Sequence, residues 1–205
     1  MKQLTNDNAA NRASYVGSVY NVGEKVIKEE LLASFPSKWS DLHRKGYIHI
    51  HDLDAYGKTY NCLTFDILSS FPYEAFKGLS DTAIIIRLFG YFKTMFADMG
   101  NEQSGGMAFA NFDNDLEEIL RKLNVKDNLQ NRELIASCIG DFILWCNNTH
   151  TRMGQTSYYV TLNIGLARND LARFIAYSVI DEFEKCGETV YKPNIVFKVS
   201  AGVNR

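Results

Sequence analysis

Residues 46–54 read Gly-Tyr-Ile-His-Ile-His-Asp-Leu-Asp, and the pair Asn61-Cys62 follows shortly after them. This stretch brings two histidines, His49 and His51, and the acid Asp52 close to a cysteine. Imidazole, carboxylate and thiol groups are the side chains that bind metals and carry acid–base or redox chemistry. We therefore expect the functional site to include this stretch, and the rest of the chain has to indicate which chemistry it supports.

One interpretation of the histidines is a metal site. Residues 47–50 alternate as in a short strand, and side chains two positions apart on a strand share a face, so His49 and His51 could bind one metal ion. A metal-dependent hydrolase would need further ligands, and only His43 and His150 remain among the histidines. The other interpretation is a scaffold without metal, in which both histidines and the neighbouring acid hydrogen-bond the backbone.

Cys62 is the second candidate for chemistry. It lies in a segment, residues 59–67, that reads as extended, and Asn61 beside it is a plausible polar contact. The other three cysteines lie in helical patterns, where a thiol packs as a small apolar side chain; they are Cys138, Cys146 and Cys186. No Cys-x-x-Cys pair occurs, so free thiols in a reducing, cytoplasmic environment are expected.

Two polar connections could approach a ligand. The break Gln103-Ser104-Gly105-Gly106 carries two glycines, which let a backbone come close to a bound molecule. The loop that contains Gln155 joins a long helical pattern to a strand, and such loops often carry function. A plain turn between helices and a solvated connection are the alternatives.

The composition indicates one globular domain over residues 1–205. The chain is 46% hydrophobic and 22% charged, and it has only three prolines. A net charge of −2 and a pI near 6.1 give no general attraction for DNA or for an anionic membrane. No apolar run approaches the roughly 18 residues of a membrane span, and the polar start has no signal core.

Hydrophobic periodicity predicts long helices between short strands. The expected helices cover residues 10–35, 37–45, 81–99, 112–123, 129–148 and 169–185. The expected strands cover residues 47–50, 59–67, 158–164 and 195–199. This alternation is typical of a helix-rich α/β fold with mainly parallel strands.

Taken together and in order, four blocks of the sequence resemble the anaerobic (class III) ribonucleoside-triphosphate reductases, which belong to the glycyl radical enzymes. The blocks are residues 6–11, residues 46–66 with Asn61-Cys62 and Asp66, residues 103–106, and residues 148–165 with continuations at 192–197 and 202–204. They cover nearly the whole chain, which makes the resemblance specific.

The resemblance implies a half-barrel: the N-terminal portion of an α/β barrel built from two parallel half-sheets around a finger loop. It implies that Cys62 is catalytic and reduces a substrate radical, with electrons from formate or a thiol system. The residues expected to contact the ribonucleoside triphosphate are Asn61, Gln103, Gly105, Gly106 and Gln155. The residues expected to form a scaffold without metal are His49, His51 and Asp52.

The sequence departs from the family pattern in its radical-handling elements. It has no Met-Gly-Cys-Arg-like finger loop, no Arg-x-x-Gly-Tyr segment for the radical glycine and no paired Cys-x-x-Cys zinc motif. We expect an incomplete enzyme that is inactive alone and holds no cofactor. The complete family enzyme uses a glycyl radical, installed by an S-adenosylmethionine/iron–sulfur activase, and ATP or dNTP effectors.

The expected partners follow from this incompleteness. They are a ribonucleoside triphosphate or dNTP, a downstream reductase fragment and a second copy of the chain, without direct DNA or membrane binding. The helices near 80–99 and 129–148 are candidates for an effector and dimer surface. A metal-dependent hydrolase and a non-catalytic nucleotide-binding module remain the alternative functions.

Overall fold

A four-stranded sheet lies at the centre of the molecule, in a computed structural model that describes residues 15–151, 156–157 and 159–204. Every strand is parallel to its neighbours, in the order β1-β2-β5-β6. The strands are β1 (Leu63–Phe65), β2 (Met107–Phe109), β5 (Val160–Ile164) and β6 (Asn194–Phe197). Helices separate them along the chain, so the expected helix-rich α/β fold with parallel strands is confirmed.

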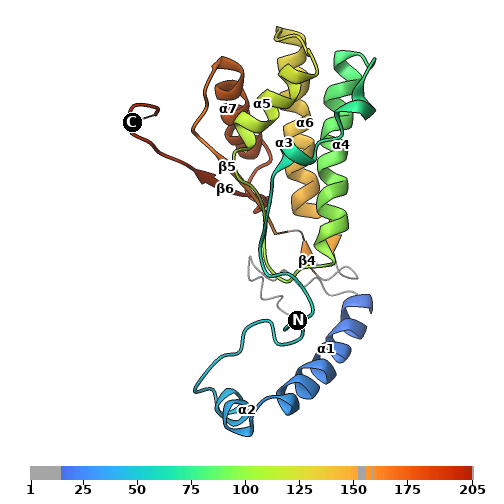
Figure 1. Ribbon diagram of the computed structural model, residues 1–205, viewed down its shortest axis with the longest axis vertical. Helices are drawn as coiled ribbons and strands as arrows, with labels where there is room; N and C mark the ends of the chain where they lie inside the picture. The colour runs from blue at the N-terminus through green and yellow to red at the C-terminus, as the bar shows by residue number, and fades with distance from the viewer. Residues whose placement is uncertain (1–14, 152–155, 158, 205) are drawn as a thin grey trace.

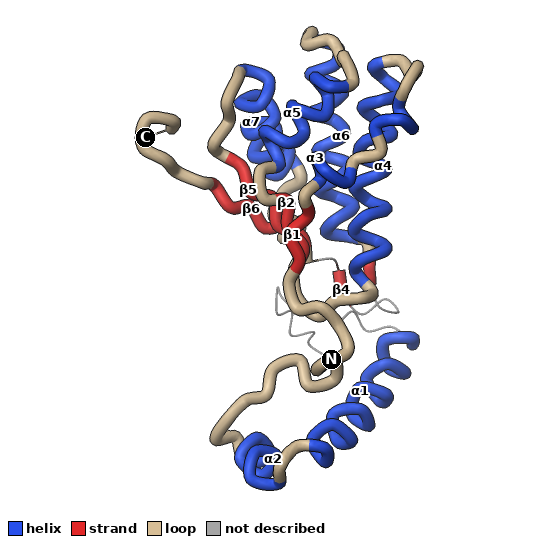
Figure 2. Tube along the Cα trace, viewed as in Figure 1, coloured by secondary structure: helices blue, strands red, loops and turns tan. Residues whose placement is uncertain are grey.

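The helices gather on one side of this sheet (Figures 1 and 2). They are α3 (Ile67–Ser70), α4 (Asp81–Gly100), α5 (Phe112–Lys122), α6 (Leu129–Asn148) and α7 (Asp170–Lys185), with a short 3-10 helix, η1 (Tyr73–Phe76). Within this layer α6 packs against α4 and α7, and α5 packs against α7 and β5. The four long helices confirm the predictions for residues 81–99, 112–123, 129–148 and 169–185.

The two faces of the sheet differ in burial because strand side chains alternate. In β5, Val160, Leu162 and Ile164 are fully buried, whereas Thr161 and Asn163 between them are only partly buried. In β2, Met107 and Phe109 are buried and Ala108 between them is not. The apolar positions face the helix layer, so the sheet has one covered face and one face that these helices leave open.

Aromatic side chains fill the space between the covered face and the helices. Phe92 and Phe96 of α4 contact Phe109 of β2 with ring centroids 5.0 and 4.8 Å apart. Phe142 of α6 lies 6.3 Å from Phe92, and Phe112 at the start of α5 stacks on Phe109 at 5.8 Å. All five rings are fully buried, which fixes the helices against the sheet.

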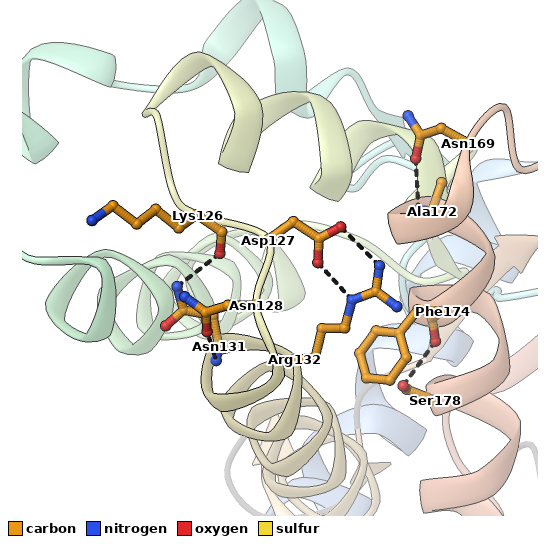
Figure 3. Close-up of polar contacts among 9 residues, drawn as sticks. All are labelled: Lys126, Asp127, Asn128, Asn131, Arg132, Asn169, Ala172, Phe174 and Ser178. Atoms are coloured by element: carbon orange, nitrogen blue, oxygen red, sulfur yellow. Dashed lines mark hydrogen bonds and ion pairs between the residues drawn. The ribbon is translucent and has the colours of Figure 1, made fainter.

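The loop between α5 and α6 ties three helices together at the end of the layer shown in Figure 3. Asn128 caps α6 by accepting a hydrogen bond from the Asn131 N–H at 2.9 Å. The buried Asn131 side chain donates to the Lys126 carbonyl at 2.8 Å and to Asp81 Oδ2, at the start of α4, at 2.9 Å. Arg132 pairs with the loop residue Asp127 and lies over the Phe174 ring of α7, 5.2 Å from its centroid.

Two helices lie apart from this layer (Figure 1). Helix α1 (Tyr15–Ser34) and helix α2 (Ser37–Arg44) contact each other, and a long connection leads from α2 to β1. The α1 stripe that predicts this helix is exposed at Val19, Val22 and Val26. The predicted residues 10–14 lie outside the described part of the chain.

The strand predicted at residues 47–50 is wrong. This segment forms a bend and then irregular backbone, and the N–H groups of Tyr47 and Ile48 both donate to the Leu42 carbonyl at the end of α2. Gly46, with φ +75°, turns the chain there, and alternation over four residues is too weak to outweigh such a helix end. Strand β2 is three residues long and was not predicted.

A second, two-stranded antiparallel sheet joins β3 (His150–Thr151) and β4 (Thr156–Ser157). Among the described residues, no helix is long and apolar enough to cross a membrane.

Candidate functional site

Cys62 is exposed and lies directly before β1. It precedes Thr64 by two positions, and side chains two positions apart on an extended segment share a face, so the thiol belongs to the open face of the sheet. Its Sγ is 3.7 Å from Asn61 Oδ1, a contact in which the thiol donates and the amide oxygen accepts. The side chain is therefore both accessible and held by its neighbour.

Residues 60–63 pair with the break between α4 and β2, which is far away in the sequence. The Tyr60 N–H donates to the Glu102 carbonyl at 3.0 Å, and the Ser104 N–H donates to the Tyr60 carbonyl at 2.8 Å. The Leu63 N–H donates to the Gly106 carbonyl at 2.9 Å. These bonds extend the parallel pairing of β1 and β2 at its amino end, and they place Asn61-Cys62 against the glycine-containing break.

The break itself is closely packed on Asn61. A Cβ atom added to Gly105 would lie 2.2 Å from the Asn61 carbonyl oxygen and 2.6 Å from its Oδ1. Gln103 is 3% exposed, and its Nε2 donates to the Gly105 carbonyl at 2.8 Å. Its Oε1 is buried and has no hydrogen-bond partner in the described part of the chain.

The register of the strands places further side chains next to this site, in a row across the sheet. Thr64 is opposite Ala108, Ala108 is opposite Thr161, and Thr161 is opposite Asn194. This row of small and polar side chains lies on the open face, one step further along the strands than Cys62. Asn163, two positions beyond Thr161, has a buried Oδ1 without a hydrogen-bond partner among the described residues. The row was missed in the sequence, because register between distant three-residue strands cannot be read from composition.

The structure thus brings together five of the six residues predicted to be catalytic or to contact substrate: Asn61, Cys62, Gln103, Gly105 and Gly106. The sixth, Gln155, lies outside the described residues. Whether these residues contact a substrate stays a prediction, and the near-complete burial of Gln103 leaves its side chain little surface to offer.

The histidines lie on the connection between α2 and β1. The His49 ring centroid is 5.7 Å from that of His43 and 5.8 Å from that of His51. His43 Nδ1 accepts the Ile50 N–H at 3.1 Å, and His51 Nε2 is 3.3 Å from Asp52 Oδ1. The strand that would have aligned His49 and His51 on one metal does not form, and the described residues contain no group of three or more potential ligands suited to a metal ion.

A second polar region lies where the strands end. Asp113, at the start of α5, is completely buried, and its carboxylate accepts the Gly165 N–H and the Asn114 N–H at 2.8 and 2.9 Å. Burial, reinforced by the nearby carboxylates, raises the pKa of Asp115 to about 6. Lys198, after β6, donates to the Ala110 carbonyl and Asn111 Oδ1. These contacts join the ends of β2, β5 and β6.

Comparison with known proteins identifies the family to which this chain is similar. A family model described as anaerobic ribonucleoside-triphosphate reductase matches residues 7–205, nearly the whole chain. No curated protein matches the chain significantly.

Proposed function

The chain belongs to the anaerobic ribonucleoside-triphosphate reductase family, and from this premise we propose that Cys62 is the thiol that reduces the substrate on the open face of its sheet. The observation that carries the proposal is the accessibility of this thiol beside a polar row of strand residues. A ribonucleoside triphosphate bound over that row would meet Cys62 at the amino end of β1.

The other cysteines support this choice by their surroundings. Cys146 is fully buried, and burial raises its pKa well above the ordinary thiol value. Burial also raises the pKa of Cys138 and of Cys186, which are partly buried in the helix layer. Cys146 is thereby shielded from substrate and reductant, Cys138 and Cys186 are partly covered by the helices, and Cys62 is the exposed thiol of the four.

The chemistry that Cys62 would perform suits a thiol. When a substrate radical takes the hydrogen atom of S–H, the S–H bond breaks, a C–H bond forms and a thiyl radical remains on the sulfur. A hydrogen atom from formate, which becomes the carbon dioxide radical anion, or from a thiol, which becomes a thiyl radical, would restore the S–H bond. Asn61 Oδ1, which accepts the S–H contact, holds the thiol toward the open face. The family's glycyl radical has no matching Arg-x-x-Gly-Tyr segment in these residues, so we assign no step through it to them.

We further propose that residues 1–205 form the N-terminal part of the catalytic barrel and are inactive alone. Parallel sheets are nearly always covered on both faces, and here the described helices cover only one. Another polypeptide segment would complete the site over the open face. Helices α4 and α6, which pack side by side and are linked by the Lys93–Asp141 ion pair, are our candidates for a surface that binds an effector nucleotide or a second copy.

Reconstitution tests this proposal. The chain is mixed without oxygen with a reductase fragment that carries the thiyl cysteine and radical glycine, an activating enzyme, a ribonucleoside triphosphate and formate or a dithiol. We expect deoxyribonucleotide formation, which Cys62→Ser abolishes and Cys186→Ser retains. A Cys62→Ser mixture that forms product at the rate of the unmodified mixture would refute the role of this thiol. Saturable dNTP binding in a mixture that never turns over would favour a non-catalytic nucleotide-binding module.

A further inference from the structure

The close approach of Gly105 to Asn61 has a consequence for Cys62. We propose that Gly105 and Gln103 are positioning residues, which set the place of the Cys62 thiol and do not themselves contact substrate. The importance of that thiol rests on the proposed function, whereas its placement rests on geometry alone.

Gly105 leaves room that no other residue would leave. Its backbone φ is not in the left-handed region, so other residues could adopt its conformation. The obstacle is space, because a Cβ atom would lie 2.2 Å from the Asn61 carbonyl oxygen and 2.7 Å from its carbonyl carbon. These are backbone atoms, which cannot rotate away as the end of a side chain can. Any larger residue at position 105 therefore has to push residue 61 off the break.

Gln103 holds Gly105 in that place. Its amide donates to the Gly105 carbonyl at 2.8 Å from a side chain that is 3% exposed. The backbone of Gln103 is itself paired with Tyr60, through a bridge between the two segments. A side chain so buried and bonded to its own turn supports the turn and has little surface left for a nucleotide.

The two residues act on Cys62 through Asn61. Displacing the Asn61 backbone moves the residue that follows it directly, and moving the Asn61 side chain breaks the contact between its Oδ1 and the Cys62 Sγ. It also strains the Ser104–Tyr60 and Leu63–Gly106 hydrogen bonds that flank the pair. The thiol would then lose its fixed direction toward the open face.

Gly106 provides a matched control. Among the described residues, a Cβ atom added there would meet a single atom within 4 Å, the Tyr159 carbonyl oxygen at 3.8 Å, an ordinary van der Waals distance. Gly105→Ala and Gly106→Ala thus make the same chemical change at adjacent positions of one turn, and only the first meets the backbone of residue 61.

The experiment measures amide hydrogen exchange and the iodoacetamide labelling of each cysteine in the full chain. In Gly105→Ala we expect exchange at the Leu63 and Ser104 amides to accelerate about tenfold, while the amides of α6 are unchanged. We expect the labelling rate of Cys62, relative to that of Cys186, to change by about threefold or more. Gly106→Ala should leave both quantities close to those of the unmodified chain.

Gln103→Leu keeps the test decisive if Gly105→Ala does not fold. It removes the hydrogen bond to Gly105 without adding volume near Asn61. We expect faster amide exchange at Leu63 and Ser104 and a changed labelling rate of Cys62, both smaller in magnitude than in Gly105→Ala. The proposal is wrong if a folded Gly105→Ala or Gln103→Leu chain matches Gly106→Ala in both measurements. Neither measurement depends on turnover, so this failure is distinguishable from a failure of the proposed function.

Discussion

At the scale of single residues, the buried carboxylate of Asp113 is a polar anchor between α5 and the end of β5. It accepts the Gly165 N–H at 2.8 Å in a place from which solvent is excluded. Asp113→Ala leaves that N–H without its partner, and we expect the free energy of unfolding to fall by about 2–3 kcal/mol. Urea unfolding followed by circular dichroism measures this loss, and a change below about 0.5 kcal/mol would contradict the anchoring role.

Asp115, two positions further along α5, should lower the stability of the fold at neutral pH, whereas Asp113 raises it. Its pKa is raised to about 6 in the folded state, from an ordinary 3.8, by burial and by the carboxylates of Asp66, Glu118 and Asp113. Between these pH values the folded state binds the proton more tightly than the unfolded state does, so this group's contribution to stability falls as the pH rises from about 4 to about 6.

Replacing Asp115 by Asn removes this titration. We expect the variant to be more stable than the unmodified chain at pH 7, by up to about 1 kcal/mol because the half-exposed site is screened by solvent. The stability difference between the two should shrink toward pH 4. A difference that stays constant from pH 4 to pH 7 would show that the carboxylate of Asp115 is not destabilised by folding.

At the scale of elements, two neighbouring residues of α6 allow a buried hydrogen-bond bridge to be compared with a surface ion pair (Figure 3). Asn131 joins the start of α4 to the α5–α6 loop, with its side chain buried, whereas the Arg132–Asp127 pair is about a third or more exposed at both side chains. We expect Asn131→Ala to cost about 2 kcal/mol and Arg132→Ala less than about 1 kcal/mol. Thermal or urea unfolding of both variants checks the order, and an equal cost would contradict it.

The elements also show how far sequence reasoning reaches. Helices α4 and α6 could be predicted because their apolar stripes extend over several turns. Strand β2 could not, because three residues carry no measurable period. At residues 47–50 the sequence does alternate, but hydrogen bonds to the end of α2 determine the backbone, so the predicted strand does not form.

The candidate site divides in the same way. Cys62 and its neighbour Asn61 could be proposed from residue type and from the family resemblance, and the break at 103–106 from its glycines. The contact that joins them depends on pairing between segments far apart in the chain, which no local pattern contains. The row Thr64, Ala108, Thr161 and Asn194 depends on register for the same reason.

At the scale of the whole molecule, the described helices α3 to α7 cover one face of the sheet (Figure 2). The exposed thiol of Cys62 lies at one end of the other face. Because parallel sheets are nearly always covered on both faces, we propose that a complementing segment covers the second face. This proposal and the assignment of the reducing thiol to Cys62 can be tested together.

The rate of deoxyribonucleotide formation by the reconstituted mixture tests these claims most directly. We expect no turnover for residues 1–205 alone, turnover after complementation, and at least about a 10³-fold loss in Cys62→Ser, because an alcohol does not replace a thiol as a hydrogen-atom donor. Cys186→Ser should stay within about twofold of the unmodified mixture. Turnover by Cys62→Ser at the unmodified rate would contradict the assignment of this thiol.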